Sequence, residues 1–258
     1  MSLGLPNKNT VLIIPTVSSA NVPQLSVDLL VHTLKVPFHS LLDHGGLLYP
    51  FAGPAERPEG SPLLGISSSL EVYHNSSITC IVQRSPTLPG SRSLFVSEVL
   101  MKFISQNQFA RIVILSSADA SRREDPDISK VFRISLSDPL LTGSIKTTVS
   151  DLSGKIAKLS VDSQSEPPTR NDYQLPKRIP GSGIAIPFLK EAMRNKLLVD
   201  AIIIYAYDGD NIPDASRLAE LALDVLEMPR PIDWVHPQSW AGVYGKEVQV
   251  GLEHGIYG

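Results

Sequence analysis

The run Leu198–Tyr205, LVDAIIIY, constrains the fold of this chain more than any other stretch of its sequence. Its residues are apolar at successive positions rather than at every second one, and many of them are β-branched. Such a run is typical of a strand that is buried on both faces, as in a sheet covered by helices. Thr10–Pro15 and Arg111–Ser116 have the same character. We therefore predict three strands at the centre of one sheet.

Segments with helical periodicity alternate with these apolar runs. Apolar residues recur every three or four positions from Asn21 to about Leu34, in Ser93–Gln106, in Ile186–Lys196 and after Asn211. In the second of these segments we place Leu94 on the apolar side. Leu70–His74 and Ile78–Arg84 flank a polar turn and predict a β-hairpin. The alternation predicts an α/β fold, a single three-layer α/β/α domain over residues 1–258 with a mixed, largely buried sheet.

The same local pattern precedes the first and the last of these helices. It reads Asn21-Val22-Pro23-Gln24 in one case and Asn211-Ile212-Pro213-Asp214 in the other. Asparagine is a favourable N-cap residue, and proline is tolerated in a first helical turn because its missing N–H is not needed there. We predict that Asn21 and Asn211 cap helices at the ends of neighbouring strands, with Gln24 completing a capping box.

Composition narrows the class of protein. The net charge of −3 shows no excess of basic residues of the kind that binds nucleic acid. No apolar run reaches the roughly 18 residues needed to span a bilayer. Residues 1–9 lack the charged start and apolar core of a signal peptide. Cys80 is the only cysteine, so we expect neither an internal disulfide nor a cysteine-based zinc site. These features favour an intracellular protein.

Two segments are expected to lie outside the folded core. Ser153–Lys177 is polar and contains prolines, so it buries too little apolar area to offset the entropy of ordering, and we expect part of it to be mobile. The tail, residues 252–258, offers an apolar anchor in Ile256, a ring with a polar tip in Tyr257 and the α-carboxylate of Gly258. Such a tail can enter a pocket and meet a lysine or a backbone nest, although apolar-aromatic ends are also common in frayed chains.

Two turns hold the candidates for chemistry. Asp208 and Asp210 flank a glycine at a strand end, where α/β proteins place catalytic carboxylates, although the same residues suit a tight turn ahead of a helix. Gly181-Ser182-Gly183 precedes a helix as phosphate-binding loops do, but it lacks the Lys-Ser/Thr ending of a P-loop. We find no base, nucleophile or phosphate-binding cluster of Arg and Lys beside them. We therefore predict no catalytic residue, no metal ion and no cofactor.

Four motifs together resemble the proteasome assembly chaperone family, and in particular the second subunit of its heterodimeric pair. They are residues 15–30 (PTVSSANVPQLSVDLL), 178–184 (RIPGSGI), 208–215 (DGDNIPDA) and 237–245 (PQSWAGVYG). The similarity covers the chain nearly end to end, but Ser153–Lys177 and Pro54–Ser69 match poorly. The resemblance assigns a structural signature to Asn21, Pro23, Asp208, Gly209, Asp210, Asn211, Pro213 and Asp214.

The resemblance implies a fold related to nucleoside phosphorylases without their activity. It implies a heterodimer with the first chaperone subunit. We expect a cytoplasmic protein that can also enter the nucleus, and from the charge and the apolar runs no nucleic-acid or membrane partner. The pair would bind the outer face of the proteasome α-ring, promote assembly of the 20S core particle and block off-pathway association. Ile256, Tyr257 and Gly258 would form a hydrophobic-Tyr-any tail that enters a pocket between α subunits. The alternative is a phosphorylase or hydrolase that uses Asp208, Asp210 and the Gly181–Gly183 turn.

Overall fold

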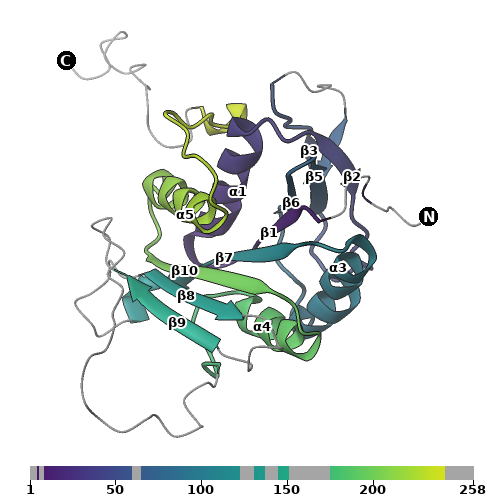
Figure 1. The fold of residues 1–258 in the computed structure, drawn as a ribbon. Coiled ribbons are helices and arrows are strands. Elements are labelled where there is room, and N and C mark those ends of the chain that lie inside the picture. Colours follow the sequence, from purple (N-terminus) through teal and green to yellow (C-terminus); the bar gives the residue numbers. More distant parts are fainter. Residues whose placement is uncertain are drawn as a thin grey trace, which may run out of the picture.

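The computed structural model describes residues 5, 9–59, 65–122, 131–136, 145–150 and 175–241. Its main sheet has eight strands in the order β2-β5-β6-β1-β7-β10-β8-β9 (Figure 1). In chain order these strands are β1 (Val11–Pro15), β2 (Phe38–Leu41), β5 (Leu70–His74), β6 (Ile78–Gln83), β7 (Arg111–Asp119), β8 (Val131–Leu136), β9 (Ile145–Ser150) and β10 (Val199–Ala206). A separate two-stranded sheet pairs β3 (Ala52–Pro54) with β4 (Ile66–Ser68).

Parallel pairing is confined to the centre of the main sheet. β6, β1, β7 and β10 are parallel to one another, and the register places Ile13 opposite Val113 and Ile114 opposite Ala201. Antiparallel pairs add β5 and β2 on one side, and β8 and β9 on the other. The sheet is therefore mixed, and its parallel strands are joined by helical crossovers, as parallel pairing requires.

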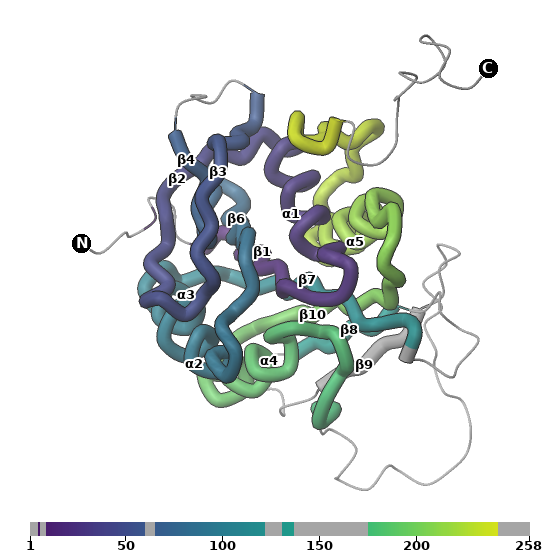
Figure 2. Tube along the Cα trace, turned by 180° about the vertical axis from the view of Figure 1, so that it is seen from behind, coloured from purple at the N-terminus to yellow at the C-terminus, as the bar shows by residue number. Residues whose placement is uncertain are grey.

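Helices cover both faces of this sheet, which gives three layers. α1 (Val22–Thr33) and α5 (Ile212–Val225) pack on one face. The other face carries α2 (Arg92–Phe95), a π-helical stretch (Val96–Leu100), α3 (Met101–Asn107) and α4 (Ala185–Arg194). Figure 2, seen from behind, shows α2, α3 and α4 on the opposite side of the sheet from α1 and α5. Within β10, Ala201 lies in the core beneath α3 and α4, whereas the next residue, Ile202, lies in the core beneath α1 and α5. Burial of successive residues explains why the run lacks alternation.

The structure confirms the predicted fold class, the three apolar strands and the hairpin of β5 and β6. β10 lies between β7 and β8, away from either edge of the sheet. Cys80 is buried in β6, and burial raises the pKa of its thiol to about 12, as expected of a small core residue. The placement of Leu94 on the apolar side was wrong, because its side chain is 49% exposed. β8 and β9 were not predicted.

Some predictions fall outside the described residues. Residues 153–174 of the segment expected to be mobile are among them, and so is the whole tail, 252–258. In the part of the chain that the structure describes, no helix is long and apolar enough to cross a membrane.

Candidate functional site

The loop that follows β1 meets the last residues of β7 at the carboxyl ends of these two strands. The hydroxyls of Ser18 and Ser117 hydrogen-bond at 2.8 Å, and the Ser117 amide also donates to Ser18 Oγ at 3.0 Å. The turn that precedes α4 joins them, because the Ser19 amide donates to the carbonyl of Gly181 at 3.0 Å and the Asp119 amide donates to that of Pro180 at 3.2 Å. Three segments distant in sequence are thus fixed side by side, where open α/β sheets commonly bind ligands.

Both glycines of this turn have a steric reason to be glycine. Gly181 and Gly183 have φ of +82° and +59°, in the left-handed region. A Cβ on Gly181 would lie 2.1 Å from Ser19 Oγ, and one on Gly183 would lie 2.4 Å from the carbonyl oxygen of Val17. The turn therefore needs glycine for close backbone approach as well as for conformation. This supports its interpretation as a packed turn.

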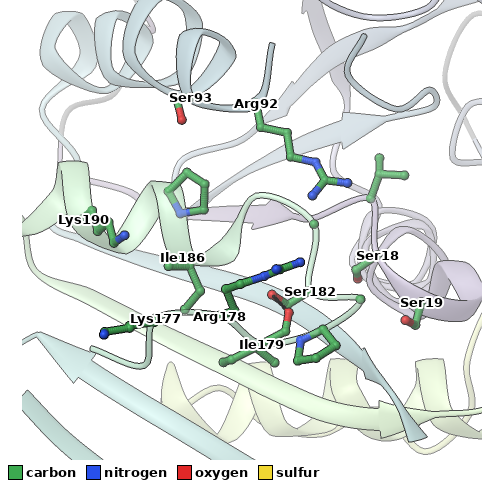
Figure 3. Close-up of a pocket in the computed structure, with 15 residues that line it drawn as sticks. Ser18, Ser19, Arg92, Ser93, Lys177, Arg178, Ile179, Ser182, Ile186 and Lys190 are labelled. Atoms are coloured by element: carbon green, nitrogen blue, oxygen red, sulfur yellow. Dashed lines mark hydrogen bonds between the residues drawn. The ribbon is translucent and has the colours of Figure 1, made fainter. Parts of the chain in front are cut away.

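A pocket of about 530 Å³ opens above this turn. Its wall combines hydroxyl, apolar and cationic groups, and the cations are Arg92, Lys177, Arg178 and Lys190. Figure 3 shows the side chains of Arg92 and Arg178 extending toward the end where Ser18 and Ser19 lie, with both lysines at the opposite end. No Asp, Glu, His or Cys is among the described residues that line it. No cluster of Arg and Lys was expected beside this turn, but the fold brings four cations together there.

The prediction that the side chains of Asn21 and Asn211 cap helices was wrong. Asn21 and Asn211 occupy the N-cap positions of α1 and α5, but neither side chain makes a capping hydrogen bond. Asn21 instead has left-handed backbone geometry, which asparagine tolerates (φ 54°, ψ 17°). Gln24 forms no capping box, since its buried Oε1 has no hydrogen-bond partner in the described structure.

At α5 the capping role belongs to Asp210. Its Oδ1 accepts a hydrogen bond from the Ile212 amide at 3.2 Å, while Asn211 Nδ2 donates to the Gly209 carbonyl at 2.9 Å. These contacts close the turn and support a structural interpretation of the DGD motif. In the same signature, partial burial raises the pKa of Asp214, and the charge of Arg217 opposes this effect.

The two Asn-apolar-Pro turns do not lie at neighbouring strands, because β7 separates β1 from β10. Their helices nevertheless share a core, in which Leu30 of α1 and Leu218 of α5 are fully buried. Pro23 is buried in the first turn of α1, whereas Pro213 is exposed in that of α5. The repeated motif thus begins two helices on one face of the sheet.

The structure does not bring the candidate carboxylates to the glycine turn. Asp208 and Asp210 are exposed after β10, and neither is among the residues that line the pocket. Within the described ranges, no group of three His, Cys, Asp or Glu side chains is placed to hold a metal ion. Arg92 and Lys190 carry no local motif, and Arg178, although it begins the motif at residues 178–184, had no predicted binding role.

The fold and the site together define an α/β/α protein with a cationic pocket at its strand ends and no general base among the described residues of that pocket. The chain belongs to the PAC2 family, whose sequence profile matches residues 12–229.

Relatives and solved structures agree with this assignment. The chain is 27% identical over 242 residues to Proteasome assembly chaperone 2 of Xenopus laevis, covering 91% of each chain. It is 27% identical over 263 residues to Proteasome assembly chaperone 2 of Homo sapiens, covering 93% of this chain and 94% of that one. The crystal structure of Pyrococcus furiosus PbaA, described as an archaeal homolog of proteasome-assembly chaperone, superposes with a TM-score of 0.61 at 14% identity, over 89% of this chain and 87% of that one. The names of these relatives denote assembly chaperones, which is a non-enzymatic role.

Proposed function

We propose that this chain is a proteasome assembly chaperone subunit that forms a heterodimer with a first chaperone subunit and binds the outer face of the proteasome α-ring. The observation that carries the proposal is similarity over about nine-tenths of the chain to proteins named Proteasome assembly chaperone 2, from Homo sapiens to Saccharomyces cerevisiae. In this role it promotes assembly of the 20S core particle and blocks off-pathway association. We expect it in the cytoplasm and the nucleus.

An exposed apolar surface beside the edge of the main sheet supports a protein partner. We call it the edge patch; its residues are Leu41, Tyr49, Phe51 and Ile66, which are 41–65% exposed. Leu41 belongs to the edge strand β2, and Ile66 begins β4. Exposed apolar groups at a sheet edge favour association, and a partner subunit that covers them would remove this hazard. The edge patch is therefore our proposed heterodimer surface.

The chain that leads to the tail is fixed to the body close to this patch. The amide and hydroxyl of Ser239 donate to the carboxylate of Glu56 at 2.7 and 2.6 Å. The Val235 amide donates to Thr33 Oγ1 at 3.0 Å, and Trp240 packs on the core beneath α1 and α5. Glu56 lies two residues after β3, and its amide donates to Ser67 Oγ of β4 at 3.4 Å. These contacts tie residues 235–240 to the body, so binding of residues 252–258 elsewhere need not disturb the core.

We propose that Ile256, Tyr257 and Gly258 insert between two α subunits. The Gly258 carboxylate would pair with a pocket lysine, since a charge-assisted hydrogen bond is roughly twice as strong as a neutral one. Fixing each backbone residue costs about 1–2 kcal/mol, so this tail alone binds weakly. A second tail on the partner subunit and contacts of the body raise the effective concentration.

The experiment compares three forms of the chain, each co-expressed with the first subunit: the original, one that lacks Ile256–Gly258, and one with several residues added after Gly258. Binding to purified core particle is measured beside the melting temperature. We expect both altered tails to weaken binding without lowering the melting temperature. Equal binding by all three forms would contradict the carboxylate mechanism, and loss of stability would show that the tail is structural.

The heterodimer is tested in the same preparation with Ile66→Glu, which places a charge in the edge patch. Met193→Glu is the matched control, because Met193 is 45% exposed but lies on α4, in a different part of the molecule. We expect the first change to reduce co-purification of the first subunit and the second to leave it intact. Equal recovery of the partner by both variants would rule out the edge patch.

The alternative, an enzyme that uses Asp208, Asp210 and the Gly181–Gly183 turn, has less support. These carboxylates lie outside the pocket that the turn lines. Purified protein that converted nucleosides in the presence of phosphate would revive it.

A further inference from the structure

The pocket above the Gly181–Gly183 turn concentrates positive charge on an otherwise acidic chain. The protein as a whole has a net charge of −3, yet four cations and no acid are found among the residues that line this pocket. Its cations come from two different helices and from the segment before the turn: Arg92 from α2, Lys190 from α4, and Lys177 and Arg178. Folding alone brings them together.

The described part of the chain places no counter-charge against these cations. Among the described residues, none of the four forms an ion pair. Elsewhere in the chain arginines are paired: Arg57 contacts the buried Glu71 at 3.0 Å, and Arg84 contacts the buried Asp28 at 2.6 Å. Like charges that face one pocket repel each other, so an anion bound there would relieve that repulsion.

The two ends of the pocket differ in chemistry. Arg92 and Arg178 extend toward the end where Ser18 and Ser19 lie, so two guanidinium groups gather there beside Ser19, while the Ser18 hydroxyl is already bonded to Ser117 (Figure 3). Guanidinium groups match the geometry of phosphate by paired hydrogen bonds. The lysines at the other end supply point charges, and Ile179 and Ile186 line the pocket with apolar surface.

The floor of the pocket is preformed. The carbonyls of Pro180 and Gly181 accept hydrogen bonds from the ends of β7 and the β1 loop, and the buried Ser182 carbonyl accepts one from Ser116 Oγ at 3.2 Å. Asp119 touches Gly181 from the β7 side, but it is not a lining residue, and its carboxylate accepts hydrogen bonds from the amide and hydroxyl of Ser121. A rigid floor lowers the entropy that a ligand must offset.

We propose that this pocket binds a small phosphorylated metabolite of about nucleotide size, with a phosphate group held by Arg92 and Arg178 beside Ser18 and Ser19. A phosphate monoester carries roughly −1.5 to −2 charges at neutral pH, so two phosphates come close to balancing four cations, whereas one carboxylate does not. The volume of about 530 Å³ lies within the usual range of ligand pockets, roughly 300–1,000 Å³. This proposal does not rest on the chaperone function.

The test is isothermal titration calorimetry of the full chain with ADP, in a phosphate-free buffer that contains EDTA. Adenosine is the control ligand because it lacks only the phosphates. Loss of charge-assisted hydrogen bonds corresponds to about tenfold or more in affinity, so adenosine should bind at least about tenfold more weakly than ADP. Raising the salt concentration should weaken ADP binding, because the four cations are exposed.

Two variants localise the binding. Arg178→Glu should weaken ADP binding about tenfold or more. Arg194→Glu makes the same change of charge on α4, outside the lining, and removes only an exposed ion pair with Glu191; it should leave ADP binding within about twofold. Both should keep the original melting temperature.

Three results would overturn the proposal. One is equal affinity for ADP and adenosine, and another is an equal loss of ADP binding in the two variants. The third is no ADP binding at about 10 mM; if a hexaglutamate peptide did bind under those conditions, the pocket would instead be a docking site for an acidic protein segment.

Discussion

Replacing Gly183 with alanine tests whether the turn at the strand ends is held by close backbone approach. Gly183 has φ of +59°, and an added Cβ would lie 2.4 Å from the Val17 carbonyl oxygen and 3.1 Å from its carbon. Neither atom belongs to a flexible side chain, so the β1 loop itself must shift. Gly45 is the matched control, because its φ is +55° and nothing lies within 4 Å of its added Cβ.

The two substitutions share one cost and differ in another. Left-handed geometry costs an alanine about 1–2 kcal/mol in either place. At Gly183 overpacking adds about 1–3 kcal/mol, which brings its total to about 2–5 kcal/mol. For a chain of this size, 1 kcal/mol corresponds to about 2–4 °C in melting temperature. Gly183→Ala should therefore melt about 2–12 °C below Gly45→Ala.

Thermal unfolding followed by circular dichroism makes this measurement, with urea unfolding to give the free energies. Equal melting temperatures of the two alanine variants would refute the steric argument. A lower melting temperature for Gly45→Ala than for Gly183→Ala would likewise refute it, because the left-handed cost is shared and only Gly183 meets the Val17 carbonyl.

Two further predictions concern carboxylates. Asp200→Asn should lower the free energy of unfolding by about 2 kcal/mol at pH 7, because it removes the charge that pairs with Arg111 and Arg133 at 2.6 and 2.8 Å; unchanged urea unfolding would contradict this. Burial alone would raise the pKa of Asp200, but hydrogen bonds and the two arginine charges outweigh it and hold that pKa below its ordinary value. A lowered folded-state pKa stabilises the protein above the unfolded pKa of about 3.9. The difference in free energy of unfolding between the original and the variant should therefore be constant from pH 5 to 8 and shrink as the pH falls below about 4. A difference that grew in acid would contradict this direction of the pKa shift. Asp210→Ala should lower the free energy of unfolding by up to about 1 kcal/mol, because it removes the helix cap. Asp208 is a neighbouring exposed acid without that hydrogen bond, so Asp208→Ala should lower it little. Equal losses in the two variants would count against the cap.

The sequence revealed the elements whose signal is local. Leu198–Tyr205, now β10, could be recognised because burial on both faces leaves a continuous apolar run in the sequence. It did not reveal β8, because Val131–Leu136 mixes polar with apolar residues and forms a strand through its pairing with β10 and β9. That pairing also brings Arg133 to Asp200, so the one charge in the apolar run acquires partners that no local pattern indicates.

The sequence by itself determined the strand–helix alternation, the position of the helix starts and the motifs that relate the chain to its family, since each depends on residues a few positions apart. Only the tertiary structure decided that Asp210, rather than Asn211, caps α5, because the choice depends on backbone angles at the turn. Only the tertiary structure assembled the cationic pocket, whose residues Ser18, Arg92 and Arg178 are separated by more than seventy positions. Proximity of this kind follows from how the strands are ordered in the sheet, and strand order is set by the packing of the whole chain.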